Sequence, residues 1–248
     1  MLLPELGEIH DQYLALARLA RARSDPGSER ESRLGGMLLL RVGFHAEGIS
    51  VLLAAALAGA AALCVDPEPE LLREGLRSGL CDFLVADLSE ALRILKNEIR
   101  QRRAVLVGVA ADPKTLLQEM AERGVQPDLI SCGSRESPPA AGVFRERGAI
   151  PVPAAQADPQ TERLVWSVET EAARVMPRVG QIAAAALEEQ REDTPARRHW
   201  LADAPRWLGR SWAGRQCLRM TRGEADSFTR QARAEFPNIS LAYDRRRT

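Results

Sequence analysis

The sequence has few of the residues from which metal sites and disulfide frameworks are built. Its 248 residues include only 4 cysteines and 3 histidines, and aromatic residues make up 4%. The cysteines are Cys64, Cys81, Cys132 and Cys217, which lie far apart and form no CxxC pair. Because thiolate metal sites and disulfide-stapled domains use closely spaced or paired cysteines, the spacing predicts neither a metal site nor a disulfide framework.

An excess of charge of either sign is also absent. The chain has 34 Lys and Arg residues and 34 Asp and Glu residues, so its formal net charge is zero. This balance gives no overall electrostatic reason to expect nucleic acid or an anionic membrane as a partner. We therefore expect a chain that binds neither.

One segment, 197–222, departs from this balance. It holds seven arginines and one acidic residue, together with Trp200, Trp207 and Trp212. Arginines mixed with aromatic residues can bind single-stranded nucleic acid. Tryptophans at nearly helical spacing are more often buried in a core or a subunit interface, and we favour that interpretation.

Long apolar runs are missing except at residues 51–65, where glycine interrupts an alanine-rich stretch. That stretch is better interpreted as a helix followed by a strand than as a membrane span. The N-terminus carries acidic residues where a signal peptide has basic ones. We expect no transmembrane segment and a cytoplasmic protein.

The most informative stretch runs from Met37 to Asp66. An apolar run at 38–42 predicts a strand, Gly43 a turn, residues 50–59 a helix, and residues 61–65 a second strand. In dinucleotide-binding folds an acidic residue about 20 positions beyond the glycine turn binds the ribose hydroxyls. Asp66 follows Gly43 at about this distance, so it is a candidate ribose ligand; the alternative is that it caps the following helix.

The turn lacks part of the glycine pattern of dinucleotide-binding folds, because only Gly43 and Gly48 are present. Between them, His45 either donates to a phosphate or is an exposed loop residue. Glu47 adds a carboxylate, which would repel a pyrophosphate at the start of the helix. The residues therefore predict a βαβ unit whose dinucleotide site is altered.

The rest of the chain predicts an α/β fold with a doubly wound, mostly parallel sheet. Further strands are expected at 81–85, 104–109 and 128–131. A helix is expected before each of these strands, at 71–78, at 113–123, and between them from Asp87 or Ser89 to residue 102. We divide the chain into an N-terminal helix (1–29), a dinucleotide-binding domain (30–155) and a mainly helical region (156–248). In the last region a helix is expected over 159–191, interrupted near Pro177, and a final strand over 237–243. Its helices are expected to join copies of the chain into a homo-oligomer.

Three segments carry a resemblance to a known family. They are LLLRVGFHAEGISVLLAAALAG (38–59), ALCVDPEPELLREGLRSGLCDFLVADLSEALRIL (62–95) and AVLVGVAADPKTLLQEMAERGVQPDLIS (104–131). Together with Asp82, the run DLSEAL (87–92) and Pro127-Asp128, they resemble the central NAD-binding domain of urocanase (urocanate hydratase), over about residues 14–149.

The resemblance implies NAD as the cofactor and a lyase of histidine catabolism. In that family NAD acts as an electrophile that adds to an imidazole, so that water can attack the activated side chain. Gly43 and Gly48 match family glycines, whereas His45 replaces another. The family segment T-D-Q-T-S-A-H-D corresponds to residues 131–138. The resulting candidate cofactor-binding residues are Gly43, His45, Gly48, Asp66, Ser131 and Ser134.

Several family features are missing. Ala46 and Ile49 replace glycines of the family turn, and the family motif D-Y-G-N-N is absent after the strand at 145–152. No P-A-R-x-C-W segment, which carries the active-site cysteine of the family, occurs, and Cys217, in GRQCLRM, does not replace that cysteine. We therefore predict a urocanase-like NAD-binding-domain protein with weakened or redirected dinucleotide binding and no complete hydratase site. We assign no catalytic residue. The alternatives are an active NAD-dependent urocanate hydratase-like lyase, and a non-catalytic scaffold or regulatory partner whose turn is closed by Phe44 and Glu47.

Overall fold

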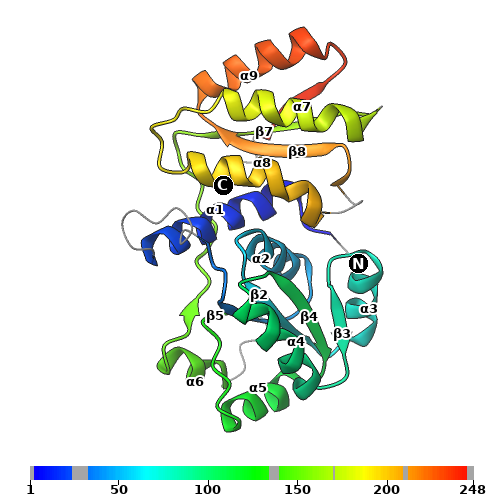
Figure 1. Cartoon of the computed structure of the whole chain (residues 1–248), viewed down its shortest axis with the longest axis vertical. Helices are drawn as coiled ribbons and strands as arrows, with labels where there is room; N and C mark the ends of the chain where they lie inside the picture. The colour runs from blue at the N-terminus through cyan, green and yellow to red at the C-terminus, as the bar shows by residue number, and fades with distance from the viewer. Residues whose placement is uncertain (1–2, 24–32, 134–139, 170, 209–211, 245–248) are drawn as a thin grey trace.

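The computed structural model describes residues 3–23, 33–133, 140–169, 171–208 and 212–244. Within these ranges the chain forms two β-sheets, one of six strands and one of three. The N-terminal helix α1 (Leu6–Arg23) crosses the molecule between the two sheets, as Figure 1 shows.

The six-stranded sheet has the order β3-β4-β2-β1-β5-β6. Its strands are β1 (Leu38–Val42), β2 (Ala61–Asp66), β3 (Phe83–Val85), β4 (Val105–Ala110), β5 (Leu129–Cys132) and β6 (Ile150–Pro151). They alternate with helices α2 (Ala46–Leu57), α3 (Pro69–Arg77), α4 (Leu88–Arg100), α5 (Pro113–Glu122) and α6 (Ala140–Glu146). All neighbouring strands are parallel, which confirms the predicted α/β fold.

Helices cover both faces of this sheet. On β1, Leu39 belongs to the hydrophobic core that includes α1 and α2, whereas Leu38 and Leu40 belong to the core that includes α4, α5 and α6. Because both faces are buried, β1 and β2 are apolar along nearly their whole length, as is usual for the central strands of parallel sheets.

Four aspartates set the local geometry of the sheet and its helices. Asp82 accepts a hydrogen bond from the Leu106 amide at 2.7 Å, and Asp128 accepts one from the Leu38 amide at 2.8 Å, so each aspartate joins the starts of two strands. Asp87 and Asp112 cap α4 and α5 by accepting from backbone amides three residues later. Asp82 and Asp128, which belong to the family resemblance, therefore have structural roles here.

The second sheet is antiparallel and has the order β8-β7-β9. It consists of β7 (Glu162–Ser167), β8 (Arg215–Met220) and β9 (Ser240–Asp244), and it is accompanied by helices α7 (Ala172–Ala185), α8 (Thr194–Leu208) and α9 (Arg222–Glu235). The predicted final strand is confirmed by β9.

The predicted helix over 159–191 is wrong in its first part, which forms β7. Leu164 and Trp166 are buried while their neighbours are more exposed, which is the period-two pattern of a strand. The later part forms α7, with Pro177 inside it as expected. Leu164 and Val168 are four residues apart, a spacing that also fits a helix, and only the pairing with β8 and β9 decides between the two.

Helix α1 is buried on most of its sides rather than on a single stripe. One side packs on α2, and the other contacts β8 and α8. Its buried residues include Ile9 and Leu16, and also the polar residues His10, Asp11 and Gln12. The helix therefore joins the cores beneath the two sheets instead of lying on the surface of one of them (Figure 1).

The carboxylate of Asp11 forms the main polar contact between α1 and the antiparallel sheet. It accepts hydrogen bonds from Arg219 of β8 at 2.5 and 2.8 Å, and it forms an ion pair with Arg163 of β7. Burial alone would raise the pKa of Asp11, but the hydrogen bonds and charges of its neighbours, Arg219 and Arg163 among them, outweigh burial and lower the pKa well below its usual range. Asp11 is therefore charged at neutral pH.

His10 lies beside this ion pair and is completely buried. Its ring contacts Trp200 edge to face, with 4.8 Å between ring centroids, and its Nδ1 lies 3.6 Å from Asp11 Oδ1. Among the described residues, neither ring nitrogen has a hydrogen-bond partner. Burial lowers the pKa of His10, so the ring is neutral at pH 7.

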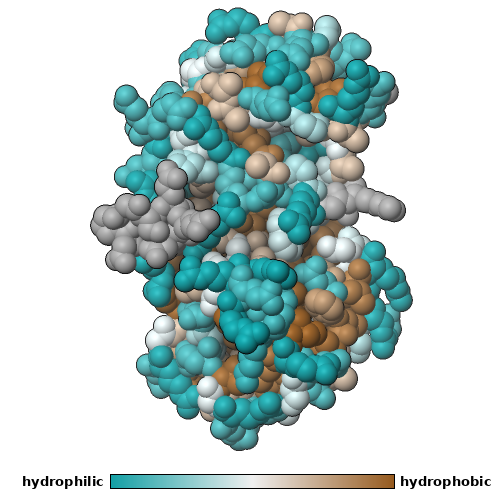
Figure 2. Space-filling view, in the orientation of Figure 1, coloured by the Kyte–Doolittle hydropathy of each residue, from teal (hydrophilic) through white to brown (hydrophobic). Residues whose placement is uncertain are grey.

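Figure 2 shows apolar side chains on the surface around β3, at one edge of the parallel sheet. Phe83 on β3 and Leu76 on α3 are exposed by 46% and 40%. β3 has only three residues, and such a short edge strand offers little template for pairing with another chain. Within the described ranges, no helix has both the length and the apolar character needed to cross a membrane.

We predict that Asp11→Asn lowers the free energy of unfolding by about 3–5 kcal/mol, because it removes the counter-charge of the buried Arg219 guanidinium and one ion-pair partner of Arg163. Urea denaturation measures the effect. The control is Glu8→Gln on the same helix, where the exposed side chain only accepts from the Glu5 amide and an amide can do the same. Equal stabilities of the two variants would contradict a central role for Asp11.

We also predict that the free energy of unfolding decreases as the pH falls below about 6.5, because the unfolded chain binds a proton at His10 that the folded chain does not. His10→Phe fills a similar volume, has no proton to bind, and should reduce this slope. Urea denaturation between about pH 7.5 and pH 5.5 compares the two proteins. An unchanged slope in the variant would contradict the assignment.

Candidate functional site

The strand order places a topological switch point between β1 and β5. From β1 the chain continues to β2 on one side, while β5 lies on the other side. In open α/β sheets, ligands bind outside the carboxyl ends of strands at such a point. Here the end of β1 carries Arg41 and Val42, which pair in register with Ser131 and Cys132 of β5, and Gly43 follows directly after β1.

The residues of the turn after β1 differ in whether they are buried or exposed. Gly43 has φ of +90°, which favours glycine, and its amide donates to the Val65 carbonyl at 2.9 Å. Phe44 is 1% exposed, and its ring lies so close to Gly75 of α3 that a Cβ added at Gly75 would be 2.5 Å from it. His45 and Glu47 remain exposed at the start of α2. Of the two residues expected to close the turn, Phe44 is therefore in the core and Glu47 is on the surface.

Asp66 is buried and bonded to both turns at this edge. Its Oδ2 accepts from the Phe44 amide at 2.6 Å, and its Oδ1 accepts from the Glu68 amide at 2.8 Å. Glu68 is the N-cap residue of α3, so Asp66 also helps to fix the start of that helix. This geometry favours the helix-capping interpretation of Asp66 over the ribose-binding one.

Arg41 is the residue at this edge that the sequence interpretation missed. It is 1% exposed; its Nε donates to the Gly43 carbonyl at 3.0 Å and its Nη1 to the Ser131 hydroxyl at 2.8 Å. Nη1 also lies 3.9 Å from a carboxylate oxygen of the exposed Glu47. The available signal was an arginine inside the apolar run LLLRV, since arginine is rarely buried without partners.

Gly48 is needed for the packing of the turn over Arg41. A Cβ at Gly48 would lie 2.3 Å from the Gly43 carbonyl oxygen and 2.8 Å from Arg41 Nε. The structure thus brings three of the candidate residues, Gly43, Gly48 and Ser131, together around one guanidinium. The candidate Ser134 lies outside the described residues.

The charges at this edge are mixed. Backbone amides in the first turn of α2 attract anions, and Arg41 adds a positive charge beneath them. Glu47, whose side chain is 68% exposed, brings a carboxylate into that same turn. Because Asp66 already accepts two backbone amides and Glu47 opposes a pyrophosphate, the residues present do not fit a dinucleotide held by ribose and pyrophosphate contacts.

The described residues hold no group of three or more His, Cys, Asp or Glu side chains placed to bind a metal ion. Cys132 is half-buried at the end of β5, whereas Cys217 is buried in β8, within the other sheet. Cys217 therefore lies in a different part of the fold from the switch point.

We predict that Gly48→Ala lowers the free energy of unfolding by about 1–3 kcal/mol, because the added methyl group collides with backbone and with Arg41. The control is Gly180→Ala in α7, where a Cβ meets no atom within 4 Å and should stabilise the helix by about 1 kcal/mol. Urea denaturation compares both variants with the unmodified protein. A Gly48→Ala protein of unchanged stability would show that the turn relaxes without cost.

A comparison with models of known protein families matches residues 7–144 to the urocanase Rossmann-like domain. The matched region covers more than half of the chain, from α1 to α6, and includes the whole unit around the switch point. The antiparallel sheet lies outside it. The match confirms the resemblance found in the sequence, and the chain belongs to the urocanase family through this Rossmann-like domain.

Proposed function

We propose that this chain is a urocanase-family domain protein in which dinucleotide binding is weakened and urocanate hydration is not carried out. The observation that supports the proposal most directly is the state of Asp66, whose two carboxylate oxygens both accept backbone amides. A ribose hydroxyl would have to reach a carboxylate that is only 1% exposed and share an oxygen that already accepts a backbone amide.

The start of α2 supports the same proposal. A pyrophosphate there would meet the carboxylate of Glu47, which has the same sign of charge. Arg41 lies 3.9 Å from that carboxylate and offsets part of its charge, but its Nε and Nη1 already donate to Gly43 and Ser131. The site therefore provides an anion with less attraction than glycines and bare amides would.

The remaining sequence offers no replacement for the missing hydratase segments. The cysteine nearest the switch point, Cys132, pairs in register with Val42, and Cys217 is buried in β8. A role as a scaffold or regulatory partner follows if the domain binds no dinucleotide at all. An active lyase is supported by family membership alone.

We predict that calorimetric titration with NAD gives a Kd weaker than about 100 μM. In the family turn, glycines stand at positions 45 and 46 and methionine at 47. The variant His45→Gly/Ala46→Gly/Glu47→Met restores these residues and should bind at least about tenfold more tightly, since it removes a like charge and leaves smaller residues beside the backbone amides. The matched control is Glu122→Met, which removes an exposed carboxylate from α5.

In the same samples, the absorbance of urocanate should not change when protein and NAD are added. Micromolar binding of NAD by the unmodified protein would contradict weakened binding. Consumption of urocanate would contradict the loss of hydratase activity. His45→Gly alone tests the alternative in which the His45 ring donates to a phosphate. In that case this variant binds NAD more weakly than the unmodified protein, and if His45 is only an exposed loop residue it does not.

A further inference from the structure

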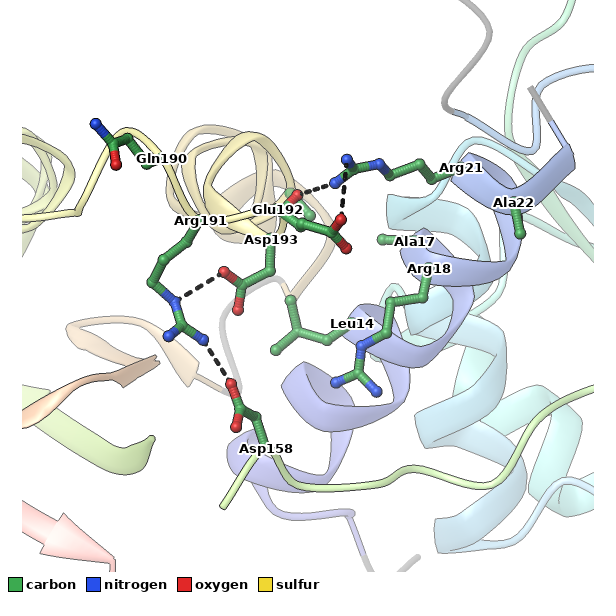
Figure 3. Close-up of a pocket in the computed structure, with 11 residues that line it drawn as sticks. Leu14, Ala17, Arg18, Arg21, Ala22, Asp158, Gln190, Arg191, Glu192 and Asp193 are labelled. Carbon is green, nitrogen blue, oxygen red and sulfur yellow. Dashed lines mark hydrogen bonds and ion pairs between the residues drawn. The ribbon is translucent and has the colours of Figure 1, made fainter. Parts of the chain in front are cut away.

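A cavity of about 830 Å³ lies between the last turns of α1 and the segment 190–193 that leads into α8 (Figure 3). This volume falls within the range of small-molecule sites. Leu14, Ala17 and Ala196 give the cavity apolar walls, and Arg18, Asp158 and Asp193 contribute charges. It shares none of its lining residues with the turn after β1, so it is independent of the proposed function.

The acidic wall of the cavity carries one more negative charge than its arginines neutralise. Arg191 lies between Asp158, at 2.5 Å, and Asp193, at 3.3 Å. Asp193 also lies 3.2 Å from Arg197, which pairs with Glu224 at 2.7 Å; these last two residues are buried and do not line the cavity. This connected group therefore contains three carboxylates and two guanidinium groups.

The opposite wall carries the complementary charge on Arg18, since the other arginine of that wall, Arg21, pairs with Glu192 at 3.7 Å. In the part of the chain that the structure describes, the one hydrogen bond of Arg18 goes to the Gln156 carbonyl, at 3.2 Å, and no carboxylate lies within ion-pair distance of it. The Gln160 amide lowers the pKa of Asp158 most, and the charges of Arg191 and Arg18 lower it further. Arg18 is thus near enough to influence Asp158 without pairing with it.

We propose that this cavity binds a small zwitterion that carries a carboxylate at one end and an ammonium group at the other. The carboxylate accepts hydrogen bonds from the Arg18 guanidinium, and the ammonium group donates to the Asp158 and Asp193 wall. Between these ends, the apolar part of the ligand lies on Leu14 and Ala17. Figure 3 shows Leu14 between Arg18 and Asp193, as this arrangement requires.

The charge distribution favours a zwitterion over a simple anion or cation. An anion would satisfy Arg18 but would add repulsion against the acidic wall, and a cation would do the reverse. A ligand with both charges satisfies both walls and leaves the net charge of the site unchanged. An aliphatic chain between the charges also uses the apolar surface of α1.

The test is a calorimetric titration of the full chain with β-alanine, γ-aminobutyrate, δ-aminovalerate and ε-aminocaproate. We expect saturable binding of at least one of them. Valerate and pentylamine each lack one of the two charges and should bind at least about tenfold more weakly than the best zwitterion. Binding of valerate or pentylamine as tightly as the zwitterion would overturn the proposal, as would no saturation by any of the four below about 10 mM.

Arg18→Met should weaken binding of the zwitterion at least about tenfold, because the guanidinium is lost while the aliphatic part of the side chain is largely kept. The matched control is Arg23→Met, which removes an exposed arginine at the end of the same helix and should leave the affinity unchanged. Circular dichroism confirms that both variants fold. Equal affinities of Arg18→Met and the unmodified protein would overturn the proposal.

Discussion

The carboxylate of Asp11 lies between two guanidinium groups that come from neighbouring strands of the antiparallel sheet. Arg163 and Arg219 face each other in register on β7 and β8, and the charge of Asp11 offsets the repulsion between these two like charges. This interaction fixes α1 against the antiparallel sheet, while its other side packs on α2. The relative position of the two sheets and the shape of the cavity beside α1 depend on this contact.

At the switch point, the domain satisfies its own polar groups where a Rossmann-like domain would use a ligand. Asp66 accepts two backbone amides, and Arg41 connects the carbonyl of Gly43 to the hydroxyl of Ser131. The aspartates that belong to the family resemblance, Asp82 and Asp128, join strand to strand. These two aspartates therefore help to form the scaffold of the domain.

The cavity lies where the matched domain meets the rest of the chain. Leu14 and Arg18 belong to the region that matches the family model, whereas Asp158, Arg191 and Asp193 lie beyond residue 144. A ligand there would contact both parts at once. A site of this kind would be a property of this chain and not of the Rossmann-like domain alone, because the family model contributes only one of its walls.

Local pattern was enough to predict the parallel sheet, since apolar strands, glycine turns and the helix-capping residues Asp87 and Asp112 act over a few residues. The same pattern also brought Gly43, Gly48 and Ser131 to one edge. It did not distinguish β7 from a helix, it gave no sign that Asp11 is buried, and it placed Arg41 inside an apolar run without identifying the groups that Arg41 bonds to. Those outcomes depend on partners far along the chain, such as Arg219 for Asp11 and Ser131 for Arg41, and only the folded structure brings such groups within hydrogen-bond distance.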